Sequence, residues 1–370
     1  MTSGHVADVL AHELDRAATT ASARFVIRPG RVPSEGQPDV VHTVLRIDDG
    51  VAVPVADVYT VDHTAPFRDE QVPVRPVGRV LVLGLTVLAG IVVWCGALLR
   101  RSPKPKSLAQ MLQLLLCLGV LLLMGIYLLL AVIAVVQLAV AVGSGGDGHA
   151  ITPPQTVVVV TSVLAVLFPG ARERLAATAE QYLRTMRYIW LSGPKSTLRG
   201  EVLAVLERIA ERPDVDRIHV LGFSFGSLVA LDTVFPSSRA PSPRVGRIST
   251  LVTVGSPFEL ASMLHPGYAE GRFAPDGGGL RWVNIYEPID LLGSSFSDER
   301  GARRGLRLTD GHEILPEVNL AWNPGQRLTA VNALMLASLR VHAQYWGPDP
   351  QAETALGLAV PHLFPTPTLA

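Results

Sequence analysis

Two long apolar stretches dominate the hydrophobic pattern of this chain. Residues 77–99 contain a single charge, Arg79, and residues 108–142 contain none. Each stretch is long enough to cross a bilayer as a helix, and the second could also fold into a tight hairpin. Two stretches of this kind are improbable as buried helices of a soluble domain. The sequence therefore predicts a transmembrane insertion over residues 77–142, with two or four spans.

A third apolar run, residues 156–168, is too short to cross a bilayer as a single helix. Prolines border it on both sides, at Pro153, Pro154 and Pro169. The run is consistent with a buried strand, a half-inserted helix or an interfacial segment, which the spacing of its valines does not distinguish.

Outside this block the pattern alternates between helical and strand periods. Near the amino terminus, Val6, Leu10 and Leu14 share one face of an amphipathic helix. Strand-like runs are expected at residues 25–27, 43–47, 53–61, 218–221, 251–254 and 282–286. A helix marked by Leu198, Val202, Val205 and Ile209 leads into the fourth of these strands. Strands that alternate with helices indicate a parallel sheet covered on both faces, so the predicted fold class is three-layer α/β.

The predicted organisation has four parts. Residues 1–76 and 170–350 are expected to form one domain around a mostly parallel sheet, which the insertion at 77–142 interrupts. Residues 351–370 are expected to be a carboxyl-terminal tail. If the early strands complete the later sheet, both parts lie on one side of the bilayer, and the number of spans is even.

The composition excludes several classes of function. The chain has 32 lysines and arginines and 32 aspartates and glutamates, so its formal net charge is zero and nothing indicates a nucleic-acid partner. Both cysteines, Cys95 and Cys117, lie in the apolar stretches, which argues against a disulfide framework and against a thiolate zinc site. No metal or cofactor is expected. Residues 1–23 lack the apolar core of a signal peptide.

The pentapeptide Gly222-Phe223-Ser224-Phe225-Gly226 lies between an apolar strand and a helix-like stretch. A Gly-x-Ser-x-Gly sequence in this setting is typical of a nucleophile elbow, a strained turn that lifts a serine hydroxyl clear of the sheet. Small residues flank such a turn, and Gly222 and Gly226 meet that requirement. Ser224 is therefore the candidate nucleophile.

Together with the elbow, later segments give the chain a resemblance to the α/β-hydrolase superfamily, and within it to lipase-like bacterial hydrolases with a transmembrane insertion. Val254-Gly255-Ser256-Pro257 is similar to the turn that usually ends the next strand of that family. The strand at 282–286 then leads to an acid, Asp290, and His342 precedes an aromatic pair, Tyr345-Trp346. The order serine, aspartate, histidine is that of the fold. The resemblance covers most of residues 197–347 and implies an α/β-hydrolase fold.

The resemblance implies a catalytic triad of Ser224, His342 and Asp290. A serine hydroxyl needs a base to take its proton as it attacks, and a histidine can do so near neutral pH. The aspartate orients the imidazole and stabilises the imidazolium. His312 is the competing base, and the competing acids are Glu287, Asp298 and Asp310, whereas Asp232 lies within the helix after the elbow and is expected to be structural.

The oxyanion hole is expected at the backbone N–H of Phe225 and near Gly30. Position 225 contributes its N–H, so its side chain does not by itself abolish the hole. The family usually carries His-Gly after its first strand, where this chain has Arg28-Pro29-Gly30. Because proline has no N–H, the departure places the second donor in question.

Location and function follow from these parts. Basic residues between the apolar stretches favour a cytoplasmic connecting loop, but arginines also flank the stretches on the other side. The lack of a signal peptide and of disulfides favours a cytoplasmic hydrolase domain on an integral, multi-pass membrane protein.

The expected function is a membrane-anchored serine hydrolase for carboxylic, lipidic esters or thioesters, with the bilayer and an ester substrate as partners. The alternatives are a non-catalytic membrane scaffold with a degenerate hydrolase domain and an acyltransferase that uses the same triad.

Overall fold

The structure of the 370-residue chain is a computed structural model. The described residues are 3–18, 24–29, 42–48, 50–61, isolated positions between 88 and 126 and between 185 and 190, 192–265, 267–276, 279–290, 292–297, 304–323, 341–342, 344–346 and 354–364. Contacts divide the chain into two units, and the elements below belong to the one made of residues 1–68, 107–112 and 192–370. In the other unit, residues 69–106 and 113–191, only isolated helical positions are described.

A four-stranded parallel sheet forms the centre of the first unit. Its strands are β4 (Ile218–Phe223), β5 (Ile248–Val254), β6 (Arg281–Tyr286) and β9 (Val318–Ala321), in the order β4-β5-β6-β9. The middle strands β5 and β6 are almost entirely buried, as expected for parallel strands that helices cover on both faces. The α/β character predicted from the alternation of strands and helices is therefore present.

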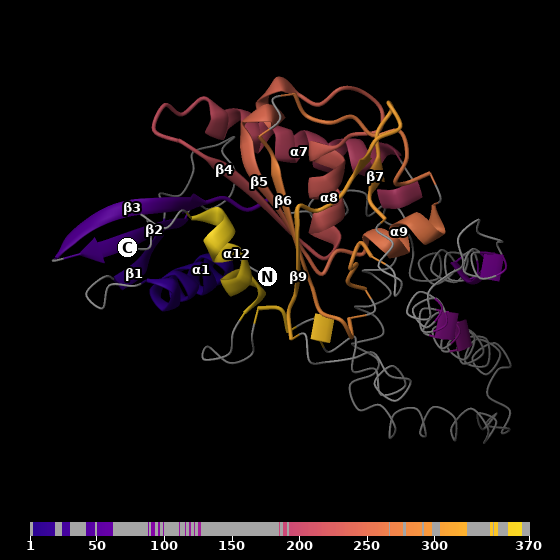
Figure 1. Cartoon of the computed structure of the whole chain (residues 1–370), viewed down its shortest axis with the longest axis horizontal. Coiled ribbons are helices and arrows are strands. Elements are labelled where there is room, and N and C mark those ends of the chain that lie inside the picture. The colour runs from indigo at the N-terminus through magenta and orange to yellow at the C-terminus, as the bar shows by residue number, and fades with distance from the viewer. Residues whose placement is uncertain are drawn as a thin grey trace, which may run out of the picture. The chain divides into compact units, whose positions relative to one another are not determined.

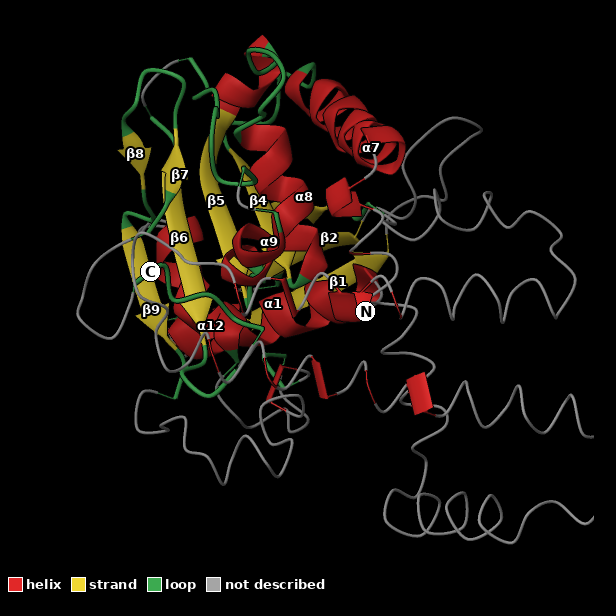
Figure 2. Ribbon diagram, turned by 90° about the vertical axis from the view of Figure 1, so that its right-hand side faces the viewer, coloured by secondary structure: helices red, strands yellow, loops and turns green. Residues whose placement is uncertain are grey.

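Helices cover the two faces of this sheet (Figures 1 and 2). On one face α8 (Phe225–Val234) packs on β4 and β5, and α7 (Ser192–Ala210) packs on α8. On the other face α12 (Ala355–Leu363) packs on β5 and β6, and α1 (Ser3–Ala17) packs on α12. The remaining elements are the 3₁₀ helix η1 (Pro243–Arg247), α9 (Phe258–Leu264) and the short hairpin of β7 (Leu306–Arg307) and β8 (Glu313–Ile314).

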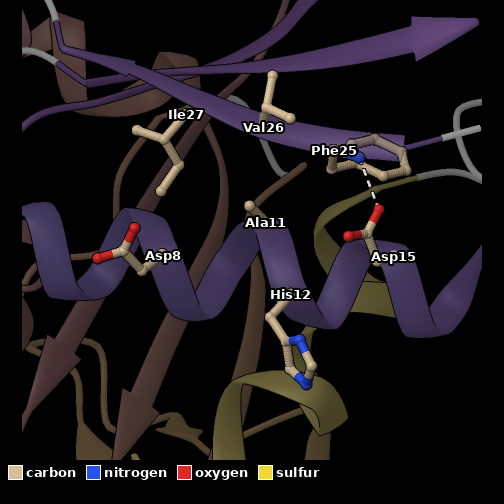
Figure 3. Close-up of a pocket in the computed structure, with 7 residues that line it drawn as sticks. All are labelled: Asp8, Ala11, His12, Asp15, Phe25, Val26 and Ile27. Atoms are coloured by element: carbon tan, nitrogen blue, oxygen red, sulfur yellow. Dashed lines mark hydrogen bonds between the residues drawn. The ribbon is translucent and has the colours of Figure 1, made fainter. Parts of the chain in front are cut away.

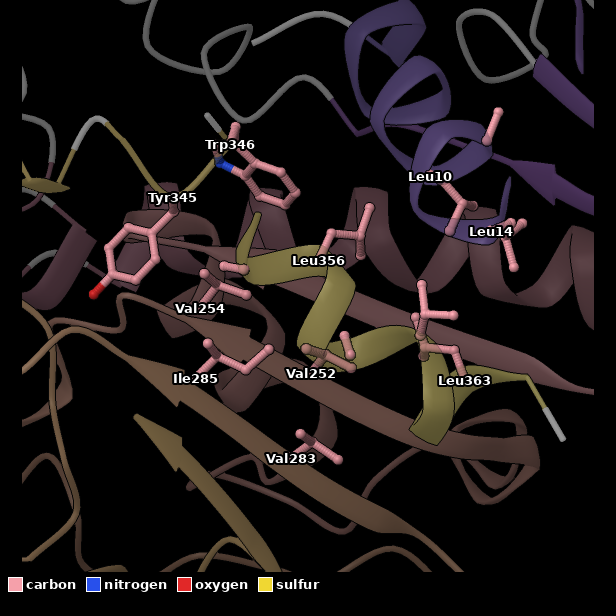
Figure 4. Packing of buried hydrophobic residues seen from close by; sticks show 14 of the residues in the cluster. Leu10, Leu14, Val252, Val254, Val283, Ile285, Tyr345, Trp346, Leu356 and Leu363 are labelled. Carbon is pink, nitrogen blue, oxygen red and sulfur yellow. The ribbon is translucent and has the colours of Figure 1, made fainter. Parts of the chain in front are cut away.

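A large apolar cluster lies under α12 (Figure 4). Alternate residues of the middle strands, Val252 and Val254 on β5 and Val283 and Ile285 on β6, face this helix and are fully buried. Leu356 of α12 covers them, and Leu10 and Leu14 of α1 extend the cluster. Residues 351–370, expected to be a tail, thus supply a helix that closes one face of the sheet. Its nearly uniform apolar sequence shows no helical period, which is why the pattern did not reveal it.

The amino-terminal strands form a sheet of their own. β1 (Arg24–Pro29), β2 (His42–Asp48) and β3 (Val51–Val58) pair antiparallel in that order, and no described pairing joins them to the parallel sheet. Gly50, at a φ of 81°, lies in the two-residue connection of the β2-β3 hairpin. The expectation that these strands complete the later sheet is therefore not met. They join the same domain through side chains instead, since Phe25 and Val44 belong to the cluster under α12.

The predicted transmembrane insertion is contradicted. Among the described residues, no helix has both the length and the apolarity needed to cross a bilayer. Most of residues 77–142 and all of residues 156–168 lie outside the described part of the chain. The prediction of an α/β fold interrupted by membrane spans is thus wrong in its second half, and that of an integral, multi-pass membrane protein is wrong with it.

A buried carboxylate fastens α1 to the start of α12. Glu13, 3% exposed, accepts hydrogen bonds through Oε1 from the Thr354 hydroxyl at 2.8 Å and the Thr354 N–H at 3.2 Å. A Cβ added at Gly357 would lie 2.5 Å from Glu13 Oε2, so the glycine makes room for the carboxylate. The Thr354 side chain in turn caps α12 through the Gly357 N–H.

We expect Glu13→Ala to lower the free energy of unfolding by about 1–3 kcal/mol, because it leaves two buried donors without their acceptor. Urea denaturation measures this change. Glu207→Ala, at an exposed position of α7, is the control and should change stability by less than about 0.5 kcal/mol. Equal losses in the two variants would contradict the role assigned to Glu13.

Candidate active site

The structure brings Ser224, His342 and Asp290 into one chain of hydrogen bonds. His342 Nε2 lies 2.7 Å from Ser224 Oγ, and His342 Nδ1 lies 2.8 Å from Asp290 Oδ2. Because an ionised carboxylate only accepts, the Nδ1–H donates to Asp290, which leaves Nε2 to accept the serine proton. The carboxylate is fully buried, whereas the imidazole is 14% exposed. This is the arrangement of a nucleophile, a base and an orienting acid.

The parallel sheet explains how three distant positions meet. Ser224 follows the last residue of β4, and its N–H donates to the carbonyl of Val254, the last residue of β5. Asp290 lies four positions beyond the end of β6, in a turn closed by its N–H to the Glu287 carbonyl. The carboxyl ends of parallel strands share one edge of a sheet, which is where such folds carry their sites.

The turn at Ser224 has the backbone strain expected of an elbow. Ser224 has a φ of 50° and a ψ of −124°, a conformation unfavourable for a residue with a Cβ. A Cβ at Gly222 would lie 2.5 Å from Ser227 Cα and 2.8 Å from the Gly226 carbonyl oxygen, so position 222 admits only glycine. At Gly226, in contrast, a Cβ would meet no atom within 4 Å. Of the two flanking glycines, only Gly222 is required by close packing.

Aromatic rings enclose the imidazole of His342. Phe223 stacks on it with ring centroids 5.5 Å apart and an interplanar angle of 22°, and Tyr345 meets it edge-on at 6.0 Å. The edge of Trp346 meets the ring of Phe223. Phe223, the residue before Ser224, thus supplies a face on which the imidazole rests.

The turn that begins at Gly255 lies against the rings of Tyr345 and His342. Gly255 has a φ of 54°, and a Cβ there would lie 2.8 Å from Tyr345 Cε2 and 3.3 Å from His342 Cε1. Its N–H donates to the Ile285 carbonyl. Glycine is needed here both for its backbone conformation and to let the two rings approach.

Three hydrogen bonds hold the carboxylate of Asp290. Oδ1 accepts from the Leu292 N–H at 2.9 Å, and Oδ2 accepts from His342 and from the Tyr345 hydroxyl, the latter at 2.8 Å. The Glu287 N–H donates to the Tyr345 oxygen at 2.8 Å. The sequence indicated Tyr345 only as half of an aromatic pair and gave no sign of this hydroxyl contact.

Two of the competing residues, His312 and Asp310, pair with each other. His312 pairs with Asp310 at 3.1 Å, and both side chains are largely exposed, the imidazole by 83%. Asp298 lies outside the described residues.

The first predicted oxyanion donor is the backbone N–H of Phe225. Phe225 is the first residue of α8, so this N–H lies at a helix amino terminus beside Ser224. Gly30, the predicted second donor, is also outside the described residues.

Asp232 belongs to a buried ionic cluster, which agrees with the structural role expected for it. Its carboxylate pairs with Arg272 and, at 2.9 Å, with Lys195 of α7, and it accepts a hydrogen bond from the Tyr268 hydroxyl at 3.3 Å. Burial alone would raise the pKa of Asp232, but the charges of Arg272 and Lys195 hold it below its usual value. The cluster ties the helix after the elbow to α7 and to the loop that follows α9. No motif in the sequence signals it.

Glu287, once a candidate acid, is buried beside the triad without belonging to it. It is 1% exposed, and neither side-chain oxygen has a well-formed hydrogen bond to a described residue. Burial raises its pKa to about 7, the nearby Asn323 side chain opposes this rise, and the charge of Asp290 adds to it. Around neutral pH the group therefore exists as a mixture of acid and carboxylate.

A shallow hollow of about 390 Å³ lies apart from the triad residues, between α1 and β1 (Figure 3). Asp15 Oδ1 at its edge accepts the Phe25 N–H at 2.6 Å. Figure 3 shows the His12 side chain pointing away from β1, so the titratable groups of α1 do not converge. No cluster of potential metal ligands occurs among the described residues of the chain.

The sequence matches no family model, and no similar curated protein or solved structure is found. Function is therefore inferred from the chemistry of the site.

The two elbow glycines give a paired test of backbone packing. We expect Gly222→Ala to destabilise the protein by several kcal/mol, because the new Cβ would overlap the backbone of α8. Gly226→Ala should be neutral or stabilising by up to about 1 kcal/mol, since alanine favours a helix. Thermal unfolding of both variants measures the difference. Similar melting temperatures would show that Gly222 is not closely packed.

Glu287 predicts a dependence of stability on pH. Its folded pKa, about 7, exceeds the ordinary value of 4.5, so the folded state binds more protons between these values and stability falls as pH rises through this window. From pH 5 to pH 8 the wild type should lose about 1–3 kcal/mol relative to Glu287→Gln, which cannot ionise. Urea denaturation at both pH values measures this loss. The exposed control Glu207→Gln should retain the wild-type slope; a similar slope in Glu287→Gln would refute the assignment.

Proposed function

We propose that this chain is a serine hydrolase that cleaves carboxylic esters or thioesters. The observation that carries the proposal is the unbroken chain Ser224–His342–Asp290, with contacts of 2.7 and 2.8 Å, on a turn in which the serine backbone is strained. This arrangement costs the fold an unfavourable φ at Ser224 and a desolvated carboxylate at Asp290. Such costs are expected where a site performs chemistry. The earlier resemblance to α/β-hydrolases supports the same reading.

In the proposed reaction, Ser224 Oγ attacks the acyl carbon while His342 Nε2 takes its proton. The imidazolium then gives that proton to the departing alcohol or thiol, which leaves an acyl group on the serine. Water, activated by the same nitrogen, releases the acid and restores the hydroxyl. Asp290 stays ionised throughout and holds the imidazolium through Nδ1. The N–H at Phe225 is the proposed donor to the oxyanion.

The expected preference for lipidic substrates depended on a membrane anchor, and that anchor is contradicted. The proposal is therefore limited to the reacting group, an acyl ester or thioester. An acyltransferase would use the same triad and the same acyl-enzyme. The two activities separate at the second step, where water or another acceptor takes the acyl group.

A fluorophosphonate probe tests the proposal, because it reacts with an activated serine whatever the natural substrate. The wild type should be labelled and should hydrolyse p-nitrophenyl esters, and Ser224→Ala should lose both properties while it remains folded. His342→Ala and Asp290→Asn should each lower kcat by roughly 10³-fold or more. His312→Ala, an exposed histidine with its own acidic partner, is the matched control and should retain activity.

The outcomes separate the alternatives. Labelling at a residue other than Ser224 would move the nucleophile, and loss of activity in His312→Ala but not in His342→Ala would move the base. A wild type that is folded but neither labelled nor active would favour the non-catalytic scaffold. Labelling without ester hydrolysis, restored by an added acyl acceptor, would favour the transferase.

A further inference from the structure

We infer that Tyr345 is a positioning residue that sets the strength of the base, through the carboxylate it shares with His342. The inference rests on the proposed function, since it assigns Tyr345 a role in the same triad. Tyr345 acts through Asp290 and has no contact with Ser224 among the described interactions.

The surroundings of the Tyr345 hydroxyl fix which group its proton is donated to. Its oxygen accepts the Glu287 N–H, so the phenolic proton is left to donate to Asp290 Oδ2 at 2.8 Å. An ionised carboxylate has no proton to return. Burial, together with the charge of Asp290, raises the pKa of Tyr345 far above its usual value, so the proton remains in place. The direction of this bond is therefore fixed by its surroundings.

The two donors to Oδ2 compete for the same negative charge. His342 Nδ1 and Tyr345 Oη each lie 2.8 Å from this one oxygen, in a carboxylate without solvent exposure. A hydrogen bond to the charged form of an acid stabilises that form and weakens its pull on other partners. The phenol should therefore moderate the support that Asp290 gives to an imidazolium at His342.

Two glycines leave room for the ring and hydroxyl of Tyr345. A Cβ at Gly293 would lie 3.0 Å from Tyr345 Oη and 2.8 Å from Asp290 Oδ2, and one at Gly255 would lie 2.8 Å from the Tyr345 ring. Two separate loops thus carry glycine where the phenol meets the acid. Tyr345 itself is fully buried. A ring needed only to fill the core would not require a hydroxyl at this point.

The test is Tyr345→Phe, with the rate of fluorophosphonate labelling measured against pH. We expect the midpoint of the acidic limb to rise by about 0.5–1 pH unit, because the unshared carboxylate holds the imidazolium more firmly. Tyr268→Phe is the control, since it removes another buried tyrosine hydroxyl from another buried aspartate, Asp232. Its midpoint should equal that of the wild type. An unchanged or lowered midpoint in Tyr345→Phe would overturn the inference.

A second replacement at position 345 tests the same hydrogen bond in case Tyr345→Phe does not fold. Placing 2,3-difluorotyrosine at position 345 keeps the shape of the ring and makes the hydroxyl a stronger donor, so the midpoint should fall. A rise, or no change, would contradict the role of the hydroxyl.

Proton NMR separates this inference from the proposed function. The His342 Nδ1 proton, in its bond to Asp290, should resonate far downfield, and its shift should change in Tyr345→Phe but not in Tyr268→Phe. If neither the wild type nor Ser224→Ala is labelled, the hydrolase proposal fails, but this resonance still tests the shared carboxylate. If labelling succeeds and the resonance is the same in all three proteins, the positioning role alone fails.

Discussion

The desolvated carboxylate of Asp290 is the constraint on which the rest of this site depends. A carboxylate without solvent exposure is tolerated only when protein donors replace water, and here they come from three places: the next turn of its own loop, His342 and Tyr345. Two of these donors belong to the segment near residues 341–346, more than 50 positions away. Satisfying one buried charge therefore fixes how the carboxyl-terminal segment docks on the end of β6, and with it the place of the imidazole.

The serine is positioned by a different kind of restraint. No side-chain charge holds Ser224; its backbone is held between the end of β4, the Val254 carbonyl and the start of α8. The buried cluster around Asp232 anchors that helix in turn to α7 and Arg272. Ser224 and His342 are thus held largely by separate networks. These networks meet at the hydrogen bond between Oγ and Nε2 and at the stacking of the Phe223 ring on the imidazole.

Part of this site could be predicted from short segments of the sequence, whereas the contacts between distant segments could not. Ser224 was predictable because an elbow needs its glycine within a few positions, whereas Asp290 and His342 were predicted from the resemblance to the order serine, aspartate, histidine of the α/β-hydrolases. The hydroxyl of Tyr345, the cluster of Asp232 with Lys195 and Arg272, and the role of Glu13 were not, because each joins positions that only tertiary packing brings together. The independent amino-terminal sheet was missed since strand periodicity does not specify partners. The membrane prediction is contradicted because no helix of the described residues has the length and apolarity of a span.

The joint between Glu13 and Thr354 has a consequence for the synthesis of the chain. These residues are 341 positions apart, so α1 leaves the ribosome long before its partner helix exists. Until α12 has been made, the apolar face formed by Val252, Val254, Val283 and Ile285 has no cover from that helix. A nascent chain with such a face exposed is prone to association with its neighbours, and N-terminal segments cannot finish folding first as they do in chains of local contacts. The requirement for chaperones should therefore be greatest in the interval just before α12 is translated.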